Sequence, residues 1–128
     1  MPDRRQLLGA SAEDLAASRL AGAGCRVVAR NARVRYAELG IAGEIDLIAI
    51  DRGTLVFVEV KAGRAGARTG PQRPVLAVDS RKQRRLRRLA RAWLASEEPP
   101  RFEAIRFDVI GVLFGAGAPE LEWIRDAF

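Results

Sequence analysis

The chain has 128 residues, a formal net charge of +6 and a sequence pI of about 10.9. This length can bury a hydrophobic core without disulfides, so we expect a single domain over residues 1–128, and the basic charge favours a polyanionic partner. The absence of histidine excludes Ser-His-Asp and Cys-His nucleophile systems and histidine-ligated zinc, so hydrolytic chemistry would rest on carboxylates, lysine, bound water and a metal ion.

The N-terminal region predicts a helix followed by a strand. Nothing in it resembles a signal peptide, and no apolar run in the chain reaches the length of a membrane span, so we expect a cytoplasmic protein without a membrane partner. Ser11 can cap a helix over about residues 12–23, with Glu13 in the first turn, where the helix dipole favours an acid. A strand from Cys25 to about Arg33 follows, and residues 34–42 read as a loop or a frayed extension of this strand.

Two strongly apolar strands come next, over residues 43–50 and 55–61, with their charged residues at the ends away from the turn between them. A core strand avoids charged side chains unless they are paired or bound to something. These positions are therefore the first candidates for a functional site. The charged residues are Glu44, Asp46, Glu59 and Lys61.

The spacing of these charges depends on the loop between the strands, for which two interpretations are open. With Arg52-Gly53 as a two-residue loop, Asp46 lies opposite Glu59, and all four charged residues share one face of the sheet. Two carboxylates this close repel each other, and a hard divalent ion with oxygen ligands would remove the repulsion. With a three-residue loop that includes Asp51, the two carboxylates face opposite sides, and the site forms only if a bulge compensates for the shift.

Two basic segments follow. Residues 62–73 read as a flexible loop that overhangs the proposed site and carries several arginines. A helix then runs from a cap at Asp79 or Ser80 to about Ala95. Its basic residues are Arg81, Lys82, Arg84, Arg85, Arg87, Arg88 and Arg91, and its buried stripe is expected to be Leu86, Leu89, Ala90, Trp93 and Leu94. Like charges this dense favour contact with nucleic acid, and a solvated helix face is the alternative.

The C-terminal part predicts two more strands. The first covers residues 102–114, and we interpret Arg106 and Asp108 within it as an ordinary edge-strand pair. A turn over residues 115–119 leads to a short strand over residues 121–124. The order of elements predicts an α/β fold in three layers, α/β/α, with a mixed central sheet of about five strands.

The charged residues resemble the signature of a known superfamily. Glu13, Asp46 and Glu59-Val60-Lys61 match the Glu…Asp…Glu-x-Lys pattern of the PD-(D/E)xK nucleases, whose fold is the restriction-endonuclease-like one. More narrowly, the chain resembles the uncharacterised UPF0102 (YraN-like) family, which is similar to archaeal Holliday-junction resolvases. The closer resemblance is carried by Arg30-Asn31, residues 43–48, residues 56–61, Lys82, residues 106–109 and Ala127-Phe128.

The resemblance implies a metal-dependent nuclease that hydrolyses DNA phosphodiester bonds, with branched DNA as a candidate substrate. Asp46 and Glu59 would ligate Mg²⁺ or Mn²⁺ with help from the carbonyl of Val60. The ion would acidify a water and neutralise charge on the scissile phosphate. Lys61 would orient or deprotonate that water, or stabilise the pentacovalent phosphorus state.

Further residues are expected to support such a site. Glu13 would hold a metal-bound water or a second ion, and Glu44 would pair with Lys61 or support the metal ligands from behind. The nucleic-acid backbone would be held by Arg64, Arg68, Arg73, Lys82, Arg85 and Arg88. A homodimer is a further expectation, because two-fold resolvases dimerise. The alternatives are a non-catalytic nucleic-acid-binding module that retains the nuclease fold, and an interaction protein whose arginines face an acidic partner.

Overall fold

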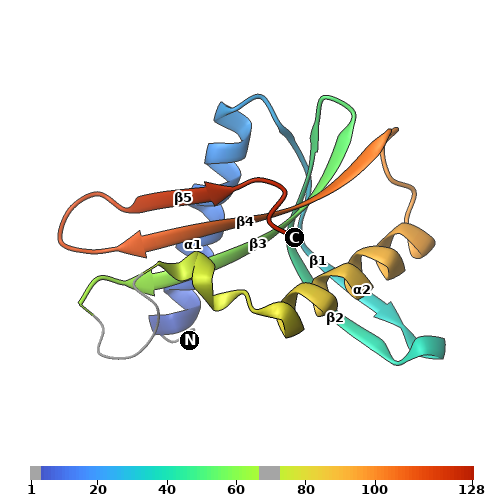
Figure 1. Cartoon of the computed structure of the whole chain (residues 1–128), viewed down its shortest axis with the longest axis horizontal. Helices are drawn as coiled ribbons and strands as arrows, with labels where there is room; N and C mark the ends of the chain where they lie inside the picture. The colour runs from blue at the N-terminus through green and yellow to red at the C-terminus, as the bar shows by residue number, and fades with distance from the viewer. Residues whose placement is uncertain (1–3, 67–72) are drawn as a thin grey trace.

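The structure, a computed structural model, describes residues 4–66 and 73–128. Arg68, one of the arginines expected to hold nucleic acid, lies outside the described residues. In chain order the elements are α1 (Arg4–Gly22), β1 (Arg26–Tyr36), η1 (Ala37–Leu39), β2 (Ile41–Asp51), β3 (Thr54–Arg64), η2 (Pro74–Ala77), α2 (Ser80–Ser96), β4 (Ala104–Phe114) and β5 (Glu120–Ile124) (Figure 1). Within the described part of the chain, neither helix is long and apolar enough to cross a membrane.

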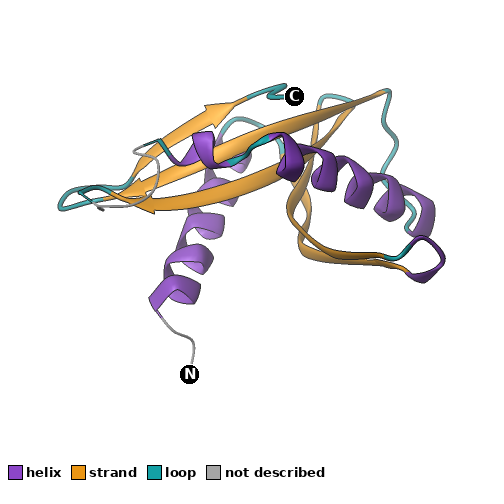
Figure 2. Cartoon of the chain, turned by 60° about the horizontal axis from the view of Figure 1, so that its bottom comes forward, coloured by secondary structure: helices purple, strands orange, loops and turns teal. Residues whose placement is uncertain are grey.

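The five strands form one sheet in the order β1-β2-β3-β4-β5. Neighbouring strands are antiparallel except β3 and β4, which run parallel and are joined by the crossover that contains α2. Helix α1 packs on one face of the sheet and α2 on the other (Figure 2). The predicted α/β fold, with a mixed five-stranded sheet between helices, is confirmed.

The strand β3 lies at the centre of this arrangement and is apolar on both faces. Val56 and Val58 pack under α1, whereas Leu55 and Phe57 pack under α2, and all four are fully buried. This explains why the sequence of β3 is a continuous apolar run, as expected for a strand that is covered on both sides. Its charged end, beyond Val58, is therefore an exception that requires an explanation.

The N-terminal helix begins earlier than predicted. Helix α1 starts at Arg4, so Ser11 lies inside the helix and does not cap it, and Glu13 lies in the middle of the helix instead of its first turn. Residues 4–10 include no proline and no β-branched side chain, and serine is tolerated in a helix interior. The helix therefore continues through the predicted start.

Of the two interpretations of residues 34–42, the strand extension is confirmed as far as Tyr36 and the loop is wrong, because most of this segment belongs to a long hairpin. Strand β1 continues to Tyr36, a single 3₁₀ turn follows, and β2 begins at Ile41. Val34 is only 3% exposed and packs under α2, which fixes this part of β1 as a strand. Gly40 has φ 62°, a left-handed conformation that lets the chain reverse in a short turn.

Helix α2 has the predicted cap and the predicted buried stripe. The carboxylate of Asp79 accepts a hydrogen bond from the backbone N–H of Lys82 at 3.0 Å, and this bond lowers the pKa of Asp79. The indole of Trp93 packs edge-on against the ring of Phe57, with centroids 5.8 Å apart. Trp93 is thus a core residue, and the basic side chains occupy the other faces of the helix.

Asp108 is not part of an ordinary edge-strand pair, because β5 covers this side of β4. Its side chain is 0% exposed and accepts hydrogen bonds from Arg106, from Trp123 Nε1 at 2.9 Å and from the Asp126 N–H at 3.0 Å. Arg106 also donates to Asp51 at 3.1 Å. Asp108 therefore anchors the C-terminal segment to the sheet, a role that depends on a strand more than ten residues away in sequence.

Candidate functional site

The hairpin between β2 and β3 has the two-residue loop. Arg52 and Gly53 have φ values of 49° and 87°, which is the pattern of a type I′ turn. The ladder begins with Asp51 opposite Thr54 and continues without a shift. The three-residue interpretation is thereby excluded, and the register is the one that the metal hypothesis requires.

The ladder between these two strands stops at Leu47 and Val58, just before Asp46 and Glu59. Beyond this point β2 is paired with β1, and β3 with β4. The two carboxylates are therefore not held opposite each other by backbone hydrogen bonds. They lie where the central strands separate, and the gap is open to side chains from other elements.

The separation coincides with a break in side-chain alternation. Ile45 and Ile48 both pack under α2, although their odd spacing would place them on opposite faces of a regular strand. On β1, Asn31 has φ 49°, and it lies between the pairs that Arg30 and Ala32 form with β2. Asparagine tolerates this conformation better than most residues. Asn31 belongs to the Arg30-Asn31 motif, whose sequence alone does not predict this backbone conformation.

Asp46 fills part of the gap between the strands. Its Oδ2 accepts a hydrogen bond from the backbone N–H of Val60 at 2.8 Å. Burial and then the negative charge of Glu59 raise the pKa of Asp46 to about 7, against the opposing effects of the Val60 hydrogen bond and of Lys61. The carboxylate is therefore held in place by the backbone but is electrostatically unfavourable when charged.

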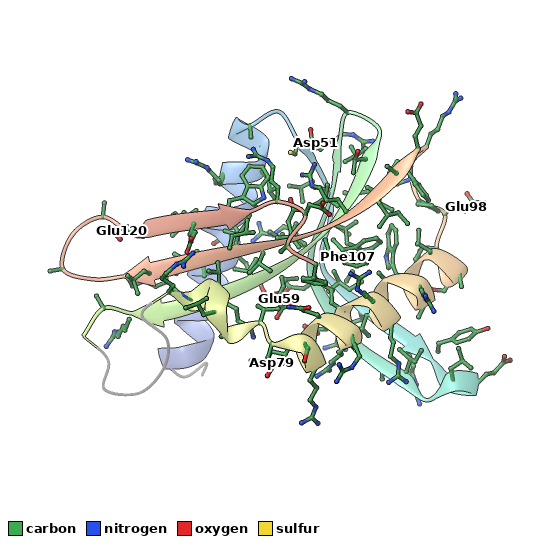
Figure 3. All side chains as sticks on the ribbon, in the orientation of Figure 1. Asp51, Glu59, Asp79, Glu98, Phe107 and Glu120 are labelled. Atoms are coloured by element: carbon green, nitrogen blue, oxygen red, sulfur yellow. The ribbon has the colours of Figure 1, made fainter. Side chains whose placement is uncertain are left out.

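Glu59 and Lys61 are two residues apart on β3 and point to the face that α2 covers. The Lys61 Nζ lies 3.3 Å from the Glu59 Oε1, and their side chains are 28% and 21% exposed. Two half-buried charges thus compensate each other at the mouth of the gap. Figure 3 shows Glu59 beside the N-terminal half of α2.

Of the two roles expected for Glu44, the pair with Lys61 does not form. It lies opposite Arg33 in the β1–β2 ladder, and the Arg33 Nε is 3.3 Å from the Glu44 Oε1. The reason is the separation of β2 from β3, which removes Lys61 from the opposing position. Glu44 still borders the same cavity as Asp46.

Glu13 approaches this region from the α1 side of the sheet. Burial raises the pKa of Glu13, and the charge of Glu44 acts in the same direction, whereas a hydrogen bond from Asn31 and the charge of Arg30 lower it. The charge of Glu13 also contributes to the raised pKa of Asp46, so the two carboxylates lie close enough to interact. Glu13 is thus placed behind Asp46, outside the lining of the cavity.

A cavity of about 390 Å³ is lined both by the charged residues of β2 and β3 and by basic residues of α2. It is lined by Gly43, Glu44, Asp46, Glu59, Lys61, Lys82, Arg85, Leu86 and Leu89. Acids and bases from three elements therefore meet in one concave site. Such a mixture of half-buried titratable groups in a cavity is typical of a functional site.

The expected nucleic-acid contacts are only partly brought together. Lys82 and Arg85 line the cavity, and Arg88 borders the next depression along α2. Arg64 is exposed at the end of β3 and does not border the cavity. The Arg73 guanidinium is bound to Glu122 of β5, with an Nε–Oε1 distance of 3.0 Å. Arg73 thus has a structural partner that the sequence analysis did not anticipate.

The available ligands fit a Mg²⁺-type ion that keeps several waters better than an ion that is enclosed by protein side chains. Among residues 4–66 and 73–128, no three carboxylate, thiol or imidazole side chains are grouped to hold a metal ion. Asp46 and Glu59 supply two carboxylates that raise each other's electrostatic cost. Mg²⁺ is commonly bound by one or two carboxylates, with waters and phosphate oxygens completing its shell. The residues present are therefore compatible with Mg²⁺ or Mn²⁺ bound together with water.

Known proteins match nearly the whole chain. Residues 12–112 match the model of the uncharacterised protein family UPF0102. A UPF0102 protein of Rhodococcus opacus (strain B4) is 46% identical over 122 residues, which cover 94% of this chain and 95% of that protein. A UPF0102 protein of Nocardia farcinica is 45% identical, covering 97% and 91%, and one of Solibacter usitatus is 44% identical, covering 94% and 84%.

Proposed function

Because the chain belongs to the uncharacterised protein family UPF0102, its activity has to be argued from its residues, and we propose a metal-dependent nuclease that hydrolyses DNA phosphodiester bonds. The observation that carries the proposal is the cavity in which Asp46 and Glu59 lie beside Lys61. Burial, and then the charge of Glu59, raise the pKa of Asp46, and Lys61 does not offset this effect. A divalent cation would supply a counterion that does.

The residues divide the chemistry among them. Asp46 and Glu59 would hold Mg²⁺ or Mn²⁺, which, when bound, lowers the pKa of a water and neutralises phosphate charge. Lys61 has a half-buried ammonium group with three donors, so it can orient the attacking water or contact a phosphate oxygen. Glu13 approaches Asp46 from behind and would fix the orientation of that carboxylate through a shared water.

The basic side of the cavity supports the choice of substrate. Lys82 and Arg85 lie on the same cavity as the carboxylates, and they belong to a helix that carries seven basic residues between Arg81 and Arg91. Such side chains contact the phosphates of nucleic acid without reading the base sequence. A backbone-directed nuclease is therefore favoured over one that recognises a specific sequence.

A cleavage assay tests this proposal. Single-stranded, duplex and branched DNA are incubated with the protein and Mn²⁺, and Asp46→Asn and Lys61→Ala are compared with the wild type. We expect each substitution to reduce the rate by about a hundredfold or more, because each removes a group that acts on the reacting phosphate. Glu120→Gln, at the exposed end of β5, serves as the control. Equal cleavage by the wild type and the two site variants would disprove the assignment.

A non-catalytic nucleic-acid-binding module is the second candidate, and one observation favours it. Asp46 accepts a hydrogen bond from the Val60 N–H and Glu59 is paired with Lys61, so each acid has one partner without a metal ion. This candidate predicts salt-sensitive DNA binding that needs no metal and survives Asp46→Asn. It also predicts no cleavage. For either candidate, a homodimer would present two such cavities to one branched substrate, which light scattering in solution can test.

A further inference from the structure

The basic residues of α2 differ in their surroundings, and only some of them face the site. The guanidinium of Arg87 lies over the rings of Phe107 and Phe128, 5.0 and 5.4 Å from their centroids. Arg81 and Arg84 border an outer depression, which is also lined by Asp79, Lys82, Arg85 and Arg88, but they border neither the carboxylate cavity nor the depression beside residues 40–42. These arginines therefore have aromatic partners or lie on the outer surface of the helix, away from the carboxylates.

A different row runs along the edge of α2 that faces the β1–β2 hairpin. Lys82, Arg85 and Arg88 are three residues apart, which places them on one side of a helix at steps of about 4.5 Å. Lys82 and Arg85 border the carboxylate cavity, and Arg85 and Arg88 border a second depression floored by Gly40 and Ala42. We call this line of contact between α2 and residues 40–43 the seam.

Arg85 lies at the junction of these depressions. It borders the carboxylate cavity, the depression toward the hairpin tip and the outer depression. Its guanidinium forms no ion pair within 4.0 Å with any other described residue, although Glu44, Asp46 and Glu59 border the same cavity. A guanidinium in this position is available to bind an anion that enters the cavity.

Gly43 provides the space for this side chain. A Cβ atom at Gly43 would lie 3.0 Å from the Arg85 Nη2 and 3.1 Å from the Leu89 Cδ2, which is too close without a shift. Gly43 is not among the glycines with positive φ, so its backbone does not require glycine. The small residue is therefore explained by the close approach of Arg85 and Leu89, whose side chains would have to move by a few tenths of an ångström to admit a Cβ atom.

We propose that Arg85 binds the phosphate in the carboxylate cavity and that the substrate is a single nucleic-acid strand lying along the seam, contacted in turn by Lys82, Arg85 and Arg88. The proposal rests on the function proposed for the cavity. One row of cations matches one row of phosphates, whereas a duplex presents two strands and would call for cations on both sides of a groove. The seam is bounded by α2 on one side and by the hairpin on the other (Figure 1).

Binding without cleavage tests this inference separately from the nuclease activity. Fluorescence anisotropy is measured for a labelled single strand and the matching blunt duplex, with Ca²⁺ replacing Mg²⁺ and Mn²⁺. We expect Arg85→Ala to weaken single-strand binding about tenfold or more and to reduce the slope of log K against log salt by about 0.7. The matched control is Arg84→Ala, the same charge change on the outer surface, with a loss under about threefold and an unchanged slope.

Two further variants sharpen the test. Arg85→Lys should recover only part of the affinity, because lysine lacks the planar fork of donors. Gly43→Ala should weaken binding less than Arg85→Ala does, because it only shifts the guanidinium, and the thermal midpoint shows whether the fold is retained. Equal effects of Arg84→Ala and Arg85→Ala, duplex binding as tight as single-strand binding, or no binding at low salt would each overturn the inference. If the binding differences persist but Mn²⁺ gives no cleavage, the nuclease proposal fails and this one stands.

Discussion

Replacing Asp46 with asparagine should stabilise the protein, and the gain should depend on pH. The pKa of Asp46 rises from 3.8 to about 7 because burial and Glu59 disfavour the charged form. Between these two pH values the folded state holds a proton that the unfolded state has lost. Stability therefore falls as pH rises through this window, and Asp46→Asn removes the effect. The asparagine oxygen can still accept the hydrogen bond from the Val60 N–H.

The expected gain in the free energy of unfolding follows from the pKa shift of Asp46. A change from 3.8 to about 7 corresponds to about 4 kcal/mol at about 1.4 kcal/mol per pH unit, when the site is fully deprotonated. Part of this energy is shared with Glu59, and the cavity admits water to the carboxylate. We therefore expect Asp46→Asn to be about 2 to 4 kcal/mol more stable than the wild type near pH 8, and within about 1 kcal/mol of it near pH 4.

Urea denaturation followed by the fluorescence of Trp93 and Trp123 measures this difference at both pH values. Glu38→Gln is the control, because Glu38 is exposed at the hairpin tip and should give no pH-dependent difference. A gain that is the same near pH 4 and pH 8 would refute the reasoning. A wild type more stable than Asp46→Asn near pH 8 would refute it as well, unless a divalent ion is present.

Three other predictions concern Asp46, Asp108 and Arg52. Mn²⁺ should raise the thermal midpoint of the wild type near pH 8 but not that of Asp46→Asn, and an equal rise in both would remove Asp46 from the metal site. Asp108→Asn should lower the free energy of unfolding, measured by urea denaturation, by about 3 kcal/mol, because it removes the buried charge that pairs with Arg106. The control Glu120→Gln, on the exposed end of β5, should lower it by less than about 0.5 kcal/mol. Arg52→Asn should stabilise by about 0.5 kcal/mol, because asparagine suits the left-handed first position of the turn; a destabilised variant would mean that Arg52 has a contact beyond its backbone role.

The fold could be predicted because its main signals are local. The apolar runs of β2 and β3, the Asp79 cap and the buried stripe of α2 each lie within a few neighbouring residues, and each is found in the structure. The hairpin register could not be decided in the same way. Arg52-Gly53 is a less specific turn sequence than Asn-Gly, and only the backbone conformation of the two residues separates the alternatives.

The geometry of the site depends on contacts between residues that are distant in sequence, and local sequence patterns do not predict such contacts. The end of the β2–β3 ladder is set by the pairing of β2 with β1 and of β3 with β4. This is why the expected Glu44–Lys61 pair is replaced by Glu44–Arg33. Asp108 likewise looked like a surface residue because its partners Trp123 and Asp126 come from a strand and turn that cover it.

The end of the β2–β3 ladder also divides the sheet into two ribbons joined at a pivot. One ribbon is the β1–β2 hairpin, and the other consists of β3, β4 and β5. A small rotation about the ladder between residues 47–51 and 54–58 would change the distance between Asp46 and Glu59 without breaking a backbone hydrogen bond within either ribbon. The hairpin then acts as a lever on the spacing of the two acids, so substitutions at its distant tip can alter the chemistry at its base.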